Sequence, residues 1–249
     1  MKRIIVNILE SLLKIKISRQ PTPRGVDLFI DLDNAYGLEN FQTIFDIGAN
    51  VGMSSNHYAS CFPNSEIHSF EPVLSTYSKL QVNTKHISDR IHLVNTAIGE
   101  KNEKKEIFVN ESSVHNSLTY EYPESTKELI TVDTIDGYMS RNKIDAVDFV
   151  KVDTEGYELE VIRGAERALE NQKIGVIYLE SEPTPSKRHF VPFEVLRDKL
   201  SDFGYHVYGI YDQVPRCDGK KHLWYFNPVF VCNKLVEQGA APNAYPLRD

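Results

Sequence analysis

The stretch TIFDIGANVG, residues 43–52, is the strongest structural signal in the chain. It opens with a short run of apolar, β-branched and aromatic residues, a pattern that predicts a buried strand. Gly48 and Gly52 follow at G-x-x-x-G spacing, and residues 53–62 can continue as a helix. Glycines allow close backbone approach to a ligand, and a helix start offers unpaired N–H groups. The stretch therefore predicts a cofactor-binding strand–turn–helix unit more strongly than an ordinary glycine turn.

The acidic residue Asp46 lies at the end of this predicted strand. A dinucleotide fold expects the spacing G-x-G-x-x-G, whose N–H groups hold a pyrophosphate, and that spacing is absent here. A carboxylate suits a cationic ligand group instead, such as the amino group of a methionine moiety. A nucleotide-cofactor oxidoreductase is therefore a disfavoured alternative, and a non-catalytic cofactor-binding protein is the other.

Length, charge and cysteine usage limit the classes of protein. The chain has 249 residues and a net charge of −7, which suits one sizeable α/β domain and disfavours a nucleic-acid partner. No C-x-x-C motif predicts a zinc site or a disulfide framework, and a reducing cytoplasm is the expected location. The three cysteines are scattered at Cys61, Cys217 and Cys232.

The first 19 residues form a basic amphipathic pattern that predicts a helix, with residues 20–25 as a linker. No run approaches the roughly 20 apolar residues of a membrane span, and a secretory signal is disfavoured because Asn7 and Glu10 interrupt the apolar region. The helix packs on the core, forms a homodimer contact or lies on an anionic membrane surface. Residues 26–236 are the expected main domain and residues 237–249 a loose tail.

Strand and helix patterns alternate through the main domain and predict a mostly parallel sheet covered by helices. The connection between the last two strands is too short for a helical crossover, so those strands should pair antiparallel. The polar stretch 111–128 is expected to be a functional loop. Predicted strands are 43–47, 65–70, 91–95, 104–110, 147–152, 175–179, 205–211 and 224–232, and predicted helices are 53–62, 73–86, 157–171 and 192–203.

Carboxylates recur at the ends of the predicted parallel strands, the edge at which such sheets bind ligands. Glu71 closes the second strand about 20 residues after the glycines, a placement that lets it accept both ribose hydroxyls. Ala97, after the third strand, offers a small surface for an adenine ring. Asp46, Asp153 and Glu180 end the first, fourth and fifth strands.

Four motifs resemble the FkbM-type family of S-adenosylmethionine-dependent methyltransferases: FDIGANVG, SFEP, NTAIG and DFVKVDTEGYELEVIRGA. The resemblance covers residues 26–182 and implies a seven-stranded class I methyltransferase sheet of order 3-2-1-4-5-7-6. It implies O-methylation of a sugar, glycan or natural product. Residues outside the matched region are expected to determine which substrate is used. By the same resemblance, S-adenosylmethionine would contact Asp46, Gly48, Ala49, Asn50 and Gly52 at its methionine part, Glu71 and the following Pro72 at its ribose, Asn95, Thr96 and Ala97 at its adenine, and Asp153 beside the methyl group.

Methyl transfer to an alcohol also needs a group that accepts the hydroxyl proton. Asp153 and Glu155 are the candidates in the right place, and Lys151 is expected to neutralise nearby acids. The loop histidines His115, His189 and His222 are the alternatives.

A divalent metal is a further hypothesis, because Asp153, Glu180 and Glu182 should approach one another at adjacent strand ends. Hard oxygen ligands suit Mg²⁺, which would orient and acidify a bound hydroxyl. In the alternative, Glu180 and Glu182 pair with Lys187 or Arg188 in a solvated cluster.

Overall fold

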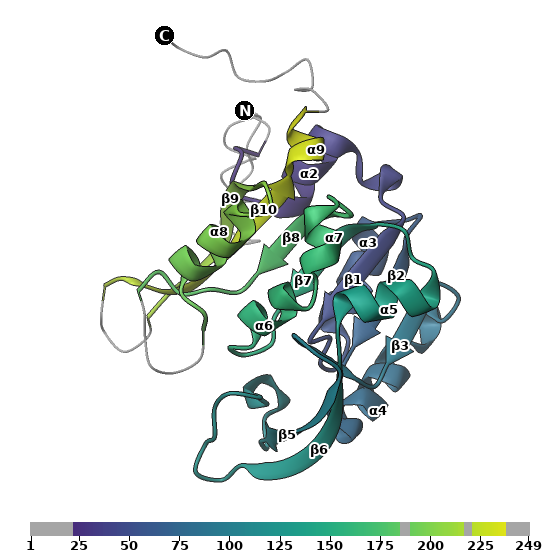
Figure 1. The fold of residues 1–249 in the computed structure, drawn as a ribbon, viewed down its shortest axis with the longest axis vertical. Coiled ribbons are helices and arrows are strands. Elements are labelled where there is room, and N and C mark those ends of the chain that lie inside the picture. The colour runs from purple at the N-terminus through teal and green to yellow at the C-terminus, as the bar shows by residue number, and fades with distance from the viewer. Residues whose placement is uncertain (1–21, 185–189, 217–220, 238–249) are drawn as a thin grey trace, which may run out of the picture.

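The computed structural model describes residues 22–184, 190–216 and 221–237. Its main sheet has seven strands, and the predicted order and reversed strand are confirmed (Figure 1). The penultimate strand in that order runs antiparallel to both neighbours, and the other pairs are parallel. Across the sheet the strands are β3 (Ile91–Val94), β2 (Glu66–Phe70), β1 (Thr43–Ile47), β7 (Val147–Val152), β8 (Ile174–Leu179), β10 (Leu223–Cys232) and β9 (Tyr205–Pro215).

Helices cover both faces of the sheet, as predicted (Figure 1). On one face α2 (Leu28–Tyr36) and α3 (Met53–Cys61) enclose one buried apolar cluster. The other face carries α5 (Ile135–Asn142), α6 (Glu158–Arg163), α7 (Glu166–Glu170) and α8 (Phe193–Ser201) over a second. The remaining helices are α4 (Leu74–Asn83) and α9 (Asn233–Glu237), with 3₁₀ turns η1 (Leu38–Asn40), η2 (Lys85–Ile87) and η3 (Ser113–His115).

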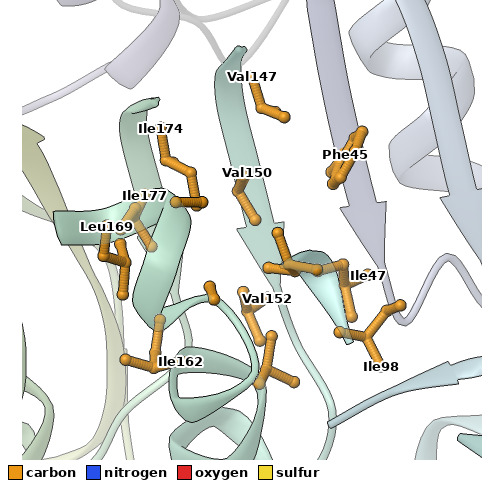
Figure 2. Close-up of a cluster of buried hydrophobic side chains, with 14 of the residues drawn as sticks. Phe45, Ile47, Ile98, Val147, Val150, Val152, Ile162, Leu169, Ile174 and Ile177 are labelled. Atoms are coloured by element: carbon orange, nitrogen blue, oxygen red, sulfur yellow. The ribbon is translucent and has the colours of Figure 1, made fainter. Parts of the chain in front are cut away.

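The central strand β1 supplies side chains to both clusters because successive residues of a strand point to opposite faces. Phe45 and Ile47 belong to the buried cluster that also contains apolar side chains of β7, α6 and α7 (Figure 2). Ile44 packs in the cluster beneath α2 and α3. Asp46 therefore points toward the α3 face, although it is fully buried.

The predicted helix over residues 157–171 is two helices, and this prediction is corrected by a tertiary contact. The chain breaks between α6 and α7, at Gly164 and Ala165. A β-carbon on Gly164 would lie 1.9 Å from the carbonyl oxygen of Gly99. Only glycine permits this approach, and α6 ends at this contact with residue 99.

A second sheet of order β4-β6-β5 adjoins the main one, and its β5–β6 hairpin projects at the lower end of the view in Figure 1. Its strands are β4 (Ala97–Ile98), β5 (Glu103–Val109) and β6 (Thr126–Asp133). The predicted strand over 104–110 corresponds to β5. Strand β6 includes the last three residues, 126–128, of the predicted loop 111–128. Helix α5 begins two residues after β6 ends.

The predicted amphipathic helix over residues 1–19 and the tail over 238–249 lie outside the described residues. Within the described ranges, none of the helices has the length and apolar character needed to cross a bilayer.

Candidate functional site

A cavity of about 410 Å³ lies at the carboxyl ends of the central strands. Its walls are the turn after β1, the ends of β2, β7 and β8, the middle of β10, and the loop between β5 and β6. The strand ends thus come together as predicted, and the hairpin loop adds a wall that the parallel sheet alone would leave open.

The turn after β1 is held by the neighbouring strand ends. The N–H groups of Gly48 and Ala49 donate to the carbonyl oxygen of Phe70 at 3.1 and 2.9 Å. Gly48 has a φ of 77° and Gly52 a φ of 91°. A β-carbon on Gly48 would lie 1.9 Å from the carbonyl oxygen of Asp153, so glycine is required for contact with β7. Gly52 packs against α4 and does not line the cavity.

Glu71 lines the cavity and is only 6% exposed. Its carboxylate accepts the N–H groups of Asn50 at 3.1 Å and Val73 at 3.0 Å. Burial raises the pKa of Glu71 to about 7, although these two N–H groups oppose the shift. The Asn95 amide donates to the carbonyl oxygens of Glu71 and Pro72, both at 2.9 Å. Asn95 therefore fixes the end of β2 from outside the cavity wall.

Lys151 of β7 connects the strand ends beneath the cavity. Its buried Nζ donates to the carbonyl oxygen of Gly48 at 2.8 Å. The same Nζ lies 3.5 Å from Asp46 Oδ1 and 3.3 Å from Asp153 Oδ2. Burial lowers the pKa of Lys151, but Asp153 and Asp46 outweigh it and the net direction is upward. Lys151 is therefore a charged buried partner of these acids, as its predicted neutralising role requires.

Asp46 does not line the cavity, so the predicted direct contact with a cationic ligand group needs revision. Its Oδ2 accepts the hydroxyls of Ser54 at 2.7 Å and Ser55 at 2.6 Å, and its other oxygen faces Lys151. These contacts anchor the start of α3 to the end of β1. Asp46 thus supports the wall of the cavity from behind and does not line it.

Three carboxylates gather at the other end of the cavity. Asp153, Glu155 and Glu180 each offer an oxygen within 4.8 Å of the others. Burial, followed by the charge of Asp153, raises the pKa of Glu155 to about 8 and of Glu180 to about 10. Ser117 and Thr119 donate to the carbonyl oxygen of Glu155 at 2.8 and 3.2 Å, which ties the hairpin loop to this cluster.

The remaining predicted residues fall in different places. Ala49, Asn50, Pro72 and Ala97 line the cavity, whereas Thr96 does not. Glu182 is buried beyond β8 and is outside both the cavity wall and the carboxylate cluster. His115 is exposed and contacts Tyr122, and His222 is also exposed. His189, Lys187 and Arg188 lie outside the described residues.

Tyr178 and Asn227 line the cavity but were not predicted from the sequence. The Tyr178 hydroxyl donates to Asp212 Oδ2 at 2.6 Å and accepts from the Asn227 amide. The available signal was the antiparallel pairing of the last strands. With Val229 opposite Tyr178, that register carries Asn227 to the level of Glu180.

Residues 46–207 match the family model described as the methyltransferase FkbM domain, which is more than half of the chain. This chain belongs to that family. The FkbM match contains the glycine turn, Glu71, Lys151 and the carboxylate cluster, but not Asn227.

This FkbM-family chain also resembles the hexuronic acid methyltransferase AglP of Haloferax volcanii, at 25% identity over 149 residues. The match covers 59% of each chain, so it spans about three fifths of that relative. Among solved structures, M. capricolum TrmK with S-adenosyl-homocysteine is similar at 12% identity and a TM-score of 0.43, with 78% of this chain and 64% of that one covered. A precorrin-6y C5,15-methyltransferase from Geobacter metallireducens is similar at 17% identity and a TM-score of 0.39, with 85% and 90% covered.

Proposed function

We propose that this chain transfers a methyl group from S-adenosylmethionine to a hydroxyl group of a sugar or glycan. The observation that carries the proposal is one continuous cavity with two chemically different ends. The glycine turn and Glu71 form one end, and the carboxylates Asp153, Glu155 and Glu180 form the other. Membership of the FkbM family and the likeness to a hexuronic acid methyltransferase support methyl transfer to a sugar.

The residues at the first end fit S-adenosylmethionine. Glu71 is a buried carboxylate that accepts two backbone N–H groups, and ribose hydroxyls would supply further hydrogen bonds to it. Ala49 and Asn50 would flank the methionine part, and the small Ala97 would face the adenine. When bound, this cofactor supplies an electrophilic methyl group on a sulfonium.

The protein's own contribution is alignment, exclusion of water and removal of a proton. Holding two reactants in line can supply much of the rate. Val114 and Leu118 of the hairpin loop line the cavity with apolar surface, which disfavours water at the reacting groups. Glu155 has a pKa near neutrality, as a group that accepts a hydroxyl proton needs.

A labelled-methyl assay tests this function. The protein is incubated with S-adenosylmethionine labelled in its methyl group and a panel of saccharides, phenols and small acids, and the products are separated. We expect label on a saccharide oxygen. Tight NAD binding without S-adenosyl binding would favour the oxidoreductase alternative, and cofactor binding without any labelled product would favour a non-catalytic binding protein.

Replacing Glu71 with alanine is expected to weaken S-adenosyl-homocysteine binding by about 1–3 kcal/mol, because hydrogen bonds to a buried carboxylate are lost. Calorimetry measures the change. Glu66→Ala is the matched control, since Glu66 is exposed at the start of β2, the strand that ends just before Glu71. Equal affinity of the Glu71 variant and the wild type would contradict the ribose assignment.

The metal hypothesis has a direct test by chelation. Glu155 replaces Glu182 in the cluster that the structure forms, and Lys151 already places a cation 3.3 Å from Asp153. We therefore expect methyl transfer to survive exhaustive EDTA treatment and to be unchanged by added Mg²⁺. Loss of turnover with EDTA and its recovery with Mg²⁺ would instead assign the carboxylates to a metal site.

A further inference from the structure

We propose that the acceptor end of the cavity selects an uncharged saccharide with neighbouring hydroxyl groups and discriminates against hexuronates. This inference rests on the proposed function and specifies its substrate class. It also separates this chain from the hexuronic acid methyltransferase that it resembles.

The first observation is a pair of buried acceptor atoms on one wall. Glu180 Oε2 and Asn227 Oδ1 have no hydrogen-bond partner among the residues that the structure describes, and both residues line the cavity. The Asn227 amide nitrogen donates to the Tyr178 hydroxyl, which fixes the orientation of the carboxamide. Buried polar atoms are rarely left unpaired in folded proteins. A ligand that donates hydrogen bonds at this wall would satisfy both atoms.

The second observation is that these two atoms come from adjacent positions in the sheet. In the antiparallel pair of β8 and β10, Val229 lies opposite Tyr178, and the bridge from Ser181 to Phe226 continues the same register. Asn227 therefore lies at the level of Glu180. Two acceptors at neighbouring strand positions match two donors on one small molecule, as on adjacent carbons of a sugar ring.

The third observation is the acidic lining of the cavity. Asp153, Glu155 and Glu180 surround the acceptor end. Among the described lining residues, the single cationic side chain is Lys151. Its Nζ already contacts Asp46, Asp153 and the carbonyl oxygen of Gly48. A hexuronate carboxylate would be buried beside this acidic cluster with no free cation among the described lining residues to receive it, whereas a neutral sugar needs none.

The test compares two acceptors that differ in one group. Methyl glucoside and methyl glucuronide of the same anomer, and the corresponding galactose pair, are each incubated with the full chain and labelled S-adenosylmethionine. We expect kcat/KM to be higher for the uncharged member of at least one pair, by about tenfold or more. Binding of S-adenosyl-homocysteine is measured in parallel, so that cofactor affinity is known independently.

Two variants test whether Glu180 and Asn227 cause the preference for the uncharged sugar. Glu180→Gln keeps the shape, cannot ionise and offers an amide donor to a carboxylate, so it should narrow the discrimination against the glucuronide. Asn227→Leu removes the unpaired acceptor, so it should raise KM for the glucoside while leaving S-adenosyl-homocysteine affinity unchanged. Glu170→Gln, on the exposed surface at the end of α7, is the control and should match the wild type.

The outcomes separate the inference from the function. Preferential methylation of the glucuronides, with or without Mg²⁺, would overturn the inference and leave the sugar methyltransferase function standing. The inference would also be overturned if Glu180→Gln discriminated against the glucuronide as strongly as the wild type and Asn227→Leu left KM for the glucoside unchanged. Label on phenols and on neither class of saccharide would overturn the proposed function and the inference with it.

Discussion

Replacing Lys151 with methionine is expected to lower the free energy of unfolding by about 3–5 kcal/mol, the cost of removing one partner from a buried ion pair. The Lys151 side chain is 6% exposed and that of Asp46 is fully buried. Without the ammonium group, Asp46 keeps only its two serine donors, and the carbonyl oxygen of Gly48 loses its donor. We expect the glycine turn to loosen as well, so S-adenosyl-homocysteine should bind more weakly.

Denaturant titration measures the loss, and a double variant locates its cause. Lys151→Met combined with Asp46→Asn removes both charges, so part of the lost stability should return relative to the single Lys151 variant. Lys104→Met, at an exposed position on β5, should change stability by no more than about 0.5 kcal/mol. Wild-type stability of Lys151→Met would refute a structural role for this ion pair.

The architecture could be predicted because its signals are local. The β-rich run before Gly48 and the alternation of strands with helices each follow from neighbouring residues. The break between α6 and α7 could not be read in this way. It depends on how closely Gly164 approaches the carbonyl oxygen of Gly99, a contact between segments distant in the sequence.

The residues of the candidate site also divide into those that local sequence signals predict and those that depend on distant contacts. The placement of Glu71 follows from its distance to the glycine turn and from the rule for parallel sheets. The contact of Asp46 with Lys151, rather than with the cavity, depends on strand register. Strands β1 and β7 pair with Asp46 opposite Lys151. Asn227 reaches the cavity through the register of β10 against β8. Register is set by the packed sheet as a whole, so a motif within one strand does not reveal it.

Replacing Glu155 with glutamine is expected to lower turnover by about 10²-fold or more, because the proton acceptor is lost while the shape is kept. Asp153 is the less suitable acceptor, since Lys151 lies 3.3 Å from its carboxylate. A raised pKa means that Glu155 gains its basic form only as pH rises through about 8. Turnover of the wild type should therefore increase with pH across that value, and this increase should be absent in Glu155→Gln.

Stability separates lost chemistry from lost folding in this variant. A carboxyl whose pKa is raised in the folded state favours folding below its unfolded pKa, and that contribution disappears as pH rises through the folded pKa of about 8. Glutamine does not ionise, so Glu155→Gln should be at least as stable as the wild type at alkaline pH. Asp153→Asn, the matched comparison, should keep the rise of turnover with pH. A Glu155 variant that retained both turnover and its pH dependence would transfer the role of proton acceptor to Asp153.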